Sequence, residues 1–216
     1  MAIKFGISAL TAIAVAAMAT LGSASAATVN YNGYDVVNNQ GVSISGPNNF
    51  NESGGSGQIL LHTSAGTLPT WCVDLFDWLA GSGTYTLSNT PSNDGAPAKP
   101  ATALSSTVAG RVGALMAYGN AHIGDSYDIS AGTQIAIWET INPGYTFTSG
   151  AGAMRVAANL FTMPLEPVNY YTVLTSVNGA GAANNQELIT AAPEPATLGL
   201  IGIGLLGLAL VRRRHR

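Results

Sequence analysis

The sequence predicts an α+β fold, a single domain of β-strands with a helical insertion of about three helices. Three observations favour this class. Residues 28–87 contain short segments in which apolar and polar side chains alternate, the period of a half-buried strand. Apolar residues recur with the period of a helix between residues 107 and 163. Strand-like segments return after residue 170, and strands followed by helices and then strands are typical of an α+β domain.

The first half of the chain predicts strands separated by turns. β-branched and aromatic side chains mark the strands, and clusters of Gly, Asn, Ser and Pro mark the connections. Residues 48–57 are rich in Gly, Asn and Ser and predict a loop, and so do residues 88–102, which hold three prolines. The expected strands are 28–31, 34–37, 42–45, 58–63, 70–76 and 84–87.

The second half predicts three helices. Apolar side chains at i, i+4, i+7 and i+8 mark one helix face over residues 107–120, with Ser106 as the N-cap. Ser130 is the expected N-cap of a second helix, which ends at Ile141 before a Pro-Gly stop signal. The remaining expected elements are a third helix over 151–163 and strands over 170–177 and 187–190.

Residues 1–26 have the three parts of a secretory signal peptide. Lys4 supplies a positive charge, residues 7–21 form an apolar stretch, and Ala24-Ser25-Ala26 is a small-residue cleavage site. We expect cleavage after Ala26, so that the mature chain starts at Ala27.

Residues 27–190 have the length of one domain, which is enough to bury a hydrophobic core. Three basic and ten acidic side chains give this body a net charge of −7, whereas the C-terminal arginines bring the whole chain to −3. Nucleic acid requires a basic surface, so the acidic body excludes a nucleic-acid partner. The composition fits a soluble extracytoplasmic protein.

The last 24 residues consist of three parts with separate physical roles. Pro193-Glu194-Pro195 is extended and open to a processing enzyme, because its prolines fix φ and lack backbone donors. The uncharged run that follows predicts a transmembrane helix over 196–211. Its purely apolar part, 198–211, is shorter than the roughly 20 residues of a usual span. Arginine side chains that extend toward the membrane surface compensate for part of this difference in length. The positive-inside rule keeps these arginines on the cytoplasmic side: Arg212, Arg213, Arg214 and Arg216.

This order of parts resembles the PEP-CTERM sorting signal of Gram-negative bacteria, over about 24 of the 216 residues. The resemblance implies a partner, the exosortase, which is a membrane-embedded, transpeptidase-like processing enzyme. It also implies export through the inner membrane, C-terminal anchoring in the membrane, and then a place at the cell surface or in the extracellular matrix. We therefore expect residues 191–216 to be a sorting signal and residues 27–190 to be the working domain.

The chain has one cysteine, Cys72, which therefore cannot form an intrachain disulfide. The residues alone leave open a buried small hydrophobe, an intermolecular bridge or a nucleophile. Trp71-Cys72 and the later segment Thr133-Gln134-Ile135-Ala136 together resemble the thioester domains of bacterial surface proteins, known by their TQxA motif. The resemblance implies an α+β thioester-like body in which Cys72 and Gln134 condense with loss of ammonia. An amine or hydroxyl target could then open the bond and become covalently attached.

The local sequence offers what this chemistry requires. Gln134 is expected in the first turn of the helix capped by Ser130, where free backbone N–H groups can polarise its carbonyl. Trp138 follows Gln134 by four residues on the same helix face and can exclude water from the bond. Trp71 and Thr133 adjoin the reacting residues in sequence and are expected to support them.

Two alternatives stand beside the thioester. The first is a non-reactive structural or binding module of the extracellular polysaccharide matrix. The second is a cysteine hydrolase in which His62 or His122 serves as the base. We expect no turnover enzyme, no cofactor and no metal site. Four carboxylates are expected to be solvated loop side chains rather than a calcium site: Asp74, Asp77, Asp125 and Asp128.

Overall fold

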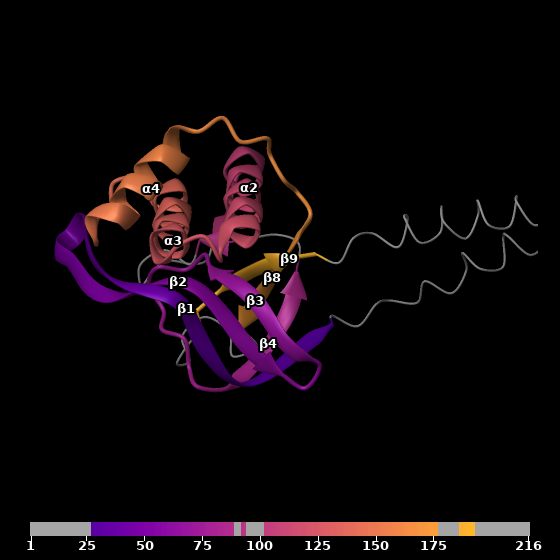
Figure 1. Cartoon of the computed structure of the whole chain (residues 1–216). Coiled ribbons are helices and arrows are strands. Elements are labelled where there is room, and N and C mark those ends of the chain that lie inside the picture. The colour runs from indigo at the N-terminus through magenta and orange to yellow at the C-terminus, as the bar shows by residue number, and fades with distance from the viewer. Residues whose placement is uncertain (1–26, 89–91, 94–101, 177–185, 193–216) are drawn as a thin grey trace, which may run out of the picture.

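The computed structural model describes residues 27–88, 92–93, 102–176 and 186–192 (Figure 1). The predicted signal peptide, the Pro-Glu-Pro segment, the transmembrane helix and the basic tail lie outside these residues. Within the described part of the chain, no helix combines the length and the apolar character that a membrane span requires.

The first two strands form a long hairpin. β1 (Thr28–Gly46) enters a 3₁₀ turn at Pro47–Asn49 and returns as β2 (Phe50–Thr63), which pairs antiparallel with it. The other strands are β3 (Gly66–Cys72), β4 (Gly83–Ser88), β7 (Thr146–Thr148), β8 (Tyr171–Ser176) and β9 (Leu188–Ala191), together with a separate pair of β5 (Ser92–Asn93) and β6 (Thr102–Ala103).

Six of the described strands close into a ring in the order β2-β3-β9-β8-β4-β1. The ring closes because the first residues of β1, Thr28–Tyr31, pair with β4, while the rest of β1 pairs with β2. Two irregularities in the β1–β2 register bend β1 between its partners, one between Tyr31 and Tyr34 and one between Val37 and Gln40. β7 adds to the far end of β1.

Three helices gather on one side of these strands (Figure 1): α2 (Ser106–His122), α3 (Tyr127–Ile141) and α4 (Ala151–Thr162). α3 is the central helix, since every residue from Ser130 to Trp138 is buried. At Gly132 an added Cβ would lie 2.6 Å from the Val156 Cβ, so α4 can pack this closely only because Gly132 has no side chain. The described residues confirm the α+β class, the single domain and the three helices.

Two strand boundaries differ from the prediction. The predicted loop at 48–57 is wrong, because β2 begins at Phe50 and its glycines pair with β1 through backbone hydrogen bonds that need no side chain. The predicted strand at 70–76 ends at Cys72. There the chain turns, and the Phe76 backbone N–H donates to the Asp74 carboxylate at 2.9 Å, the bond of an Asx turn.

Both predicted N-caps are displaced. Ser105, rather than Ser106, accepts a hydrogen bond from the Val108 N–H and caps α2. Ser126 caps α3, and the predicted cap Ser130 lies inside that helix. The Ser130 hydroxyl instead joins α3 to the strands: it accepts from the Gln58 N–H at 2.9 Å and donates to the Val37 carbonyl at 2.8 Å.

Candidate functional site

Cys72 and Gln134 meet where the end of β3 faces the middle of α3. The Cys72 N–H donates to Gln134 Oε1 at 2.9 Å, and Gln134 Nε2 donates to the Cys72 carbonyl oxygen at 2.8 Å. Both residues are buried, with 1% of their surface exposed. The β2–β3 ladder stops at the pair Ile59–Thr70. Beyond it, the Gln134 amide forms the hydrogen bonds with the Cys72 backbone that a neighbouring strand would otherwise form.

This geometry corrects the expected position of Gln134. Because α3 begins at Tyr127, Gln134 lies about two turns into the helix, away from the free N–H groups of the first turn. The donor that polarises its carbonyl is instead the Cys72 backbone N–H. The expectation of a helix-end donor is therefore wrong, and the strand supplies one in its place.

The Cys72 sulfur makes two hydrogen bonds. Its thiol donates to the Asp74 carbonyl oxygen at 2.6 Å, and the Trp138 indole Nε1–H donates to the sulfur at 3.4 Å. Burial raises the pKa of the thiol well above its ordinary value, and the nearby carboxylates of Asp74 and Glu187 raise it further, while the Trp138 hydrogen bond lowers it. The free thiol is therefore protonated at neutral pH.

A pocket of about 260 Å³ opens beside these residues, and we call it the site pocket. Cys72, Gln134 and Trp138 all line it. Its walls are mostly apolar or aromatic, and its charged lining residues are two acids, Glu52 and Asp77. The further lining residues are Tyr34, Val36, Asn39, Val42, Ile44, Phe50, Ser53, Gly54, Gly55, Gly57, Ile59, Leu75, Phe76, Trp78, Leu79 and Gln186.

The two other predicted supporting residues face α2. The Trp71 indole N–H donates to Asn120 Oδ1 at 2.9 Å, and its ring packs against Gly119, where an added Cβ would lie 2.5 Å from the ring. Thr133 is fully buried on the same side, and its Oγ1 has no hydrogen-bond partner within the described residues. The supporting roles given to Trp71 and Thr133 stay predictions.

Sequence reasoning did not predict that two acids, Asp74 and Glu187, influence the Cys72 thiol. Asp74 is fully buried and Glu187 is 3% exposed. The Glu187 carbonyl accepts a hydrogen bond from the Val73 N–H at 3.0 Å, which brings the start of the last strand against the end of β3. Asp74 stands two residues from Cys72 and could have been suspected, whereas nothing local in the sequence points to Glu187.

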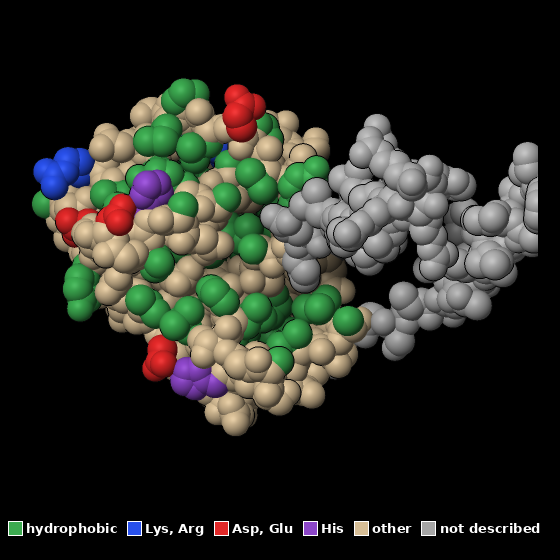
Figure 2. All heavy atoms as spheres, turned by 45° about the vertical axis from the view of Figure 1, so that its right-hand side comes forward, with side chains coloured by type: hydrophobic (Ala, Val, Ile, Leu, Met, Phe, Trp, Pro, Cys, Tyr) green, Lys and Arg blue, Asp and Glu red, His purple; other side chains and the backbone are tan. Residues whose placement is uncertain are grey.

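Neither described histidine lines the site pocket. His62 pairs with Asp35 at 3.0 Å and His122 pairs with Asp125 at 2.9 Å, and all four side chains are exposed. Figure 2 shows both histidines at the surface, each beside an acidic side chain. Within the described residues, the geometry thus gives Cys72 no histidine base of the kind a cysteine hydrolase uses.

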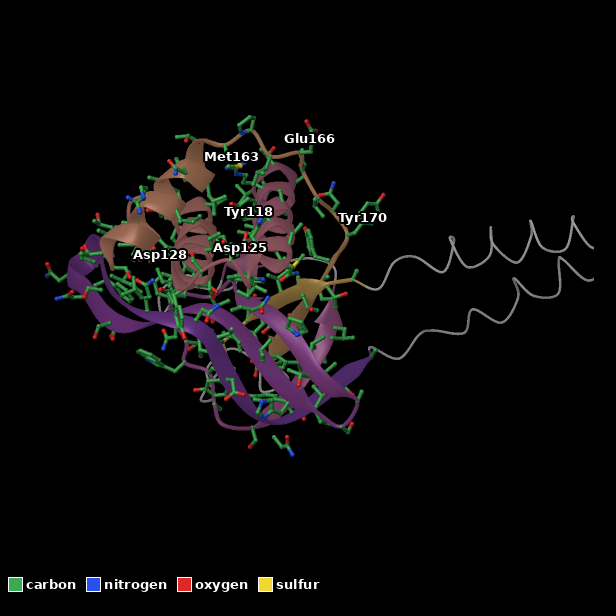
Figure 3. The ribbon with its side chains drawn as sticks, in the orientation of Figure 1. Tyr118, Asp125, Asp128, Met163, Glu166 and Tyr170 are labelled. Carbon is green, nitrogen blue, oxygen red and sulfur yellow. The ribbon has the colours of Figure 1, made fainter. Side chains whose placement is uncertain are left out.

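The carboxylates considered for calcium have different surroundings. Asp74 is buried in its turn, so the expectation of a solvated loop side chain is wrong there. Asp125 and Asp128 lie on the helical side of the molecule (Figure 3). Asp128 accepts a hydrogen bond from Gln40 Nε2 at 2.7 Å. The described part of the chain contains no cluster of three or more potential metal ligands from His, Cys, Asp and Glu.

The comparisons with known proteins concern the C-terminal segment. Residues 191–214 match the family model of the PEP-CTERM protein-sorting motif. No curated protein and no solved structure matches the chain. The matched residues include Pro193-Glu194-Pro195, the apolar run and the first arginines of the tail. The match gives the chain a PEP-CTERM sorting motif, which supports an exosortase substrate that is exported and sorted to the cell surface or the extracellular space.

Proposed function

We propose that the body of this PEP-CTERM protein attaches covalently to a surface or matrix through an internal thioester between Cys72 and Gln134. The observation that carries the proposal is the reciprocal pair of hydrogen bonds between these residues. Two hydrogen bonds fix the Gln134 amide against the residue that holds the thiol, in a buried site beside a pocket. Holding two reacting groups in place converts an improbable encounter into an intramolecular step.

The bond would form in one balanced condensation. Cys72 Sγ attacks Gln134 Cδ, the C–N bond breaks, and the thiol proton leaves with the amide nitrogen as ammonia. As the carbonyl oxygen gains negative charge, the Cys72 N–H is already placed to stabilise it at 2.9 Å. In attachment, the target nucleophile adds to the same carbon, the C–S bond breaks, and the nucleophile's proton passes to the sulfur.

The site pocket supports an amine as the target more than a hydroxyl. A nucleophile must reach Gln134 through this pocket, and the apolar walls limit competing water. Among the described lining residues the charged ones are Glu52 and Asp77, which would attract a cationic amine and offer nothing comparable to a neutral hydroxyl. The membrane anchor over 196–211 belongs to the same proposal, as the means that holds the chain at the surface before processing.

The test is the intact mass of the purified full chain before and after treatment with methylamine. A thioester lowers the mass by that of one ammonia, and methylamine then adds its own mass. The Cys72→Ala variant serves as the control, because it retains Gln134 and cannot form the bond. A full unmodified mass together with no change on methylamine treatment would overturn the proposal.

The burial of Cys72 favours one competing function. A thiol that is 1% exposed and whose pKa is raised by burial and by two carboxylates could also be inert packing in a structural or binding module of the extracellular polysaccharide matrix. In that case the mass is unmodified and a thiol reagent reacts with Cys72 only after unfolding. The same mass measurement therefore decides between the two functions.

A further inference from the structure

The sulfur of Cys72 must carry negative charge whenever the proposed thioester forms or opens. It is the attacking atom in the first reaction and the leaving group in the second. Its surroundings oppose that charge, because the site is buried and the carboxylates of Asp74 and Glu187 lie nearby. A reactive site at this position therefore needs a donor that acts on the sulfur itself.

Trp138 supplies such a donor. Its indole N–H donates to Cys72 Sγ at 3.4 Å, an ordinary length for a hydrogen bond to sulfur. A thiol or a thioester sulfur is a weak acceptor, whereas a thiolate is a charged one, so the bond strengthens as negative charge develops. The interaction thus favours the charged state over the neutral one, which is the requirement for accelerating a reaction.

The indole is held in place from two sides. Trp138 lies one helical turn after Gln134 on α3, and its ring stacks on Phe147 with the ring centres 6.1 Å apart. The side chain is 4% exposed, so water does not compete for the N–H. An indole N–H does not ionise in the physiological range, so the group acts as a fixed dipole and not as an acid or base.

We propose that Trp138 is a catalytic residue of the thioester chemistry, whose indole N–H stabilises the Cys72 thiolate as the bond to Gln134 forms and breaks. This inference rests on the proposed function and adds a role beyond the exclusion of water. It concerns the sulfur end of the bond, whereas the Cys72 N–H serves the carbonyl end.

The chain contains a matched control. Trp71 adjoins Cys72, is fully buried, and also donates its indole N–H, but to Asn120 Oδ1 and not to the sulfur. Trp138→Phe and Trp71→Phe therefore make the same chemical change within the same core. If the smaller ring itself disturbs the core, both variants should show the effect. If the lost hydrogen bond to the sulfur is the cause, only Trp138→Phe should show it.

The first measurement is the rate at which methylamine opens the thioester of the purified full chain, followed by intact mass. We expect Trp138→Phe to slow the reaction by about tenfold or more, the loss typical of a hydrogen bond to a charged group. Trp71→Phe leaves the hydrogen bond to the sulfur in place and should slow the reaction less than Trp138→Phe does. Equal rates in the unchanged protein and Trp138→Phe, or equal slowing in both variants, would overturn the inference.

The second measurement examines the thiolate itself, after methylamine has opened the thioester. The pH dependence of iodoacetamide reaction at the freed Cys72 thiol should shift to higher pH in Trp138→Phe and remain unchanged in Trp71→Phe. The other ionisable groups that influence this thiol, Asp74, Glu187 and Tyr85, are present in both variants. An unmodified mass in the unchanged protein would refute the thioester. An absent pH shift would refute the action of Trp138 on the thiolate.

A variant that fails to fold is replaced by an isosteric one. Exchange of the Trp138 indole for a benzothiophene keeps both rings and replaces the N–H by a sulfur atom, which cannot donate a hydrogen bond. The same slower opening and the same shift to higher pH are then expected, and their absence counts against the inference.

Discussion

The two sides of the Cys72–Gln134 site are built differently. On the α2 side the packing is closed: the Trp71 ring meets the backbone of Gly119, where an added Cβ would lie 2.5 Å away. On the other side lies the site pocket, where an added Cβ at Gly54 would meet the Trp78 ring at an ordinary 3.4 Å. In the proposed reaction, the α2 side would hold the reacting groups in place and the pocket side would admit their target.

The largest effect should come from removing the Cys72 sulfur, which lies between these two sides. Cys72→Ala removes the sulfur while leaving the backbone N–H and carbonyl that hold Gln134, so the fold should persist. We expect covalent attachment to disappear entirely, while export and exosortase processing continue, because the sorting signal is separate. Denaturing electrophoresis of surface material from producing cells measures attachment. Attachment that persists in this variant would exclude the pocket-side chemistry.

The next effect compares the two sides directly. Gly119→Ala places a methyl group against the Trp71 ring and should destabilise the protein by about 1–3 kcal/mol, as overpacking does. Gly54→Ala, in the pocket wall, should change stability by less than about 0.5 kcal/mol. Urea unfolding of the two variants is the measurement. Equal losses would mean that the α2 side is not the more rigid one.

A smaller effect is expected at Thr133, whose side chain is buried on the closed side. Thr133→Val replaces a hydroxyl that has no partner among the described residues by a methyl group of similar size. Stability should stay unchanged or rise by about 1 kcal/mol, because an unpaired buried donor is costly. The rate of methylamine reaction in the same variant tests the predicted supporting role of Thr133. A variant that folds but loses the thioester would instead give this hydroxyl a chemical role.

The smallest effect concerns Glu139, a carboxylate of α3 outside the pocket lining. Partial burial raises its pKa above 4.5, so the folded state disfavours the charged form. The stability that the neutral Glu139 side chain provides is therefore lost as the pH rises from its ordinary pKa through the raised one. Glu139→Gln should make the protein slightly more stable at neutral pH and equally stable below pH 4.5, by urea unfolding at both values. A gain of equal size at both pH values would contradict this assignment.

The sequence predicts the site more fully than it predicts the site's surroundings. Cys72 and Gln134 are recognisable because a single cysteine and a short motif stand in the order of a known family. The helix that carries Gln134 is also predicted, but its start is not. The expected cap Ser130 lies inside the helix, where it contacts Gln58 and Val37, and Ser126 is the residue that caps it.

The remaining differences arise from interactions between distant segments. The glycine-rich part of β2 lacks the side chains that mark a strand, yet the long partner β1 pairs with it through backbone groups. The acids near the sulfur come from the turn after β3 and from the residue before β9, more than 100 positions apart. Local patterns contain no information about such an encounter, which is set by strand order in the closed ring.

The pairing of β3 with β9 has a mechanical consequence. Cys72 lies opposite Leu188 in that pairing, and the segment that matches the sorting motif begins at the last residue of β9. In the proposed attached state, tension from a target would enter at Gln134, in the central helix, and leave through β9 toward the C-terminal tail. The load would therefore cross α3 and the last strand, while the β1–β2 hairpin would bear little of it.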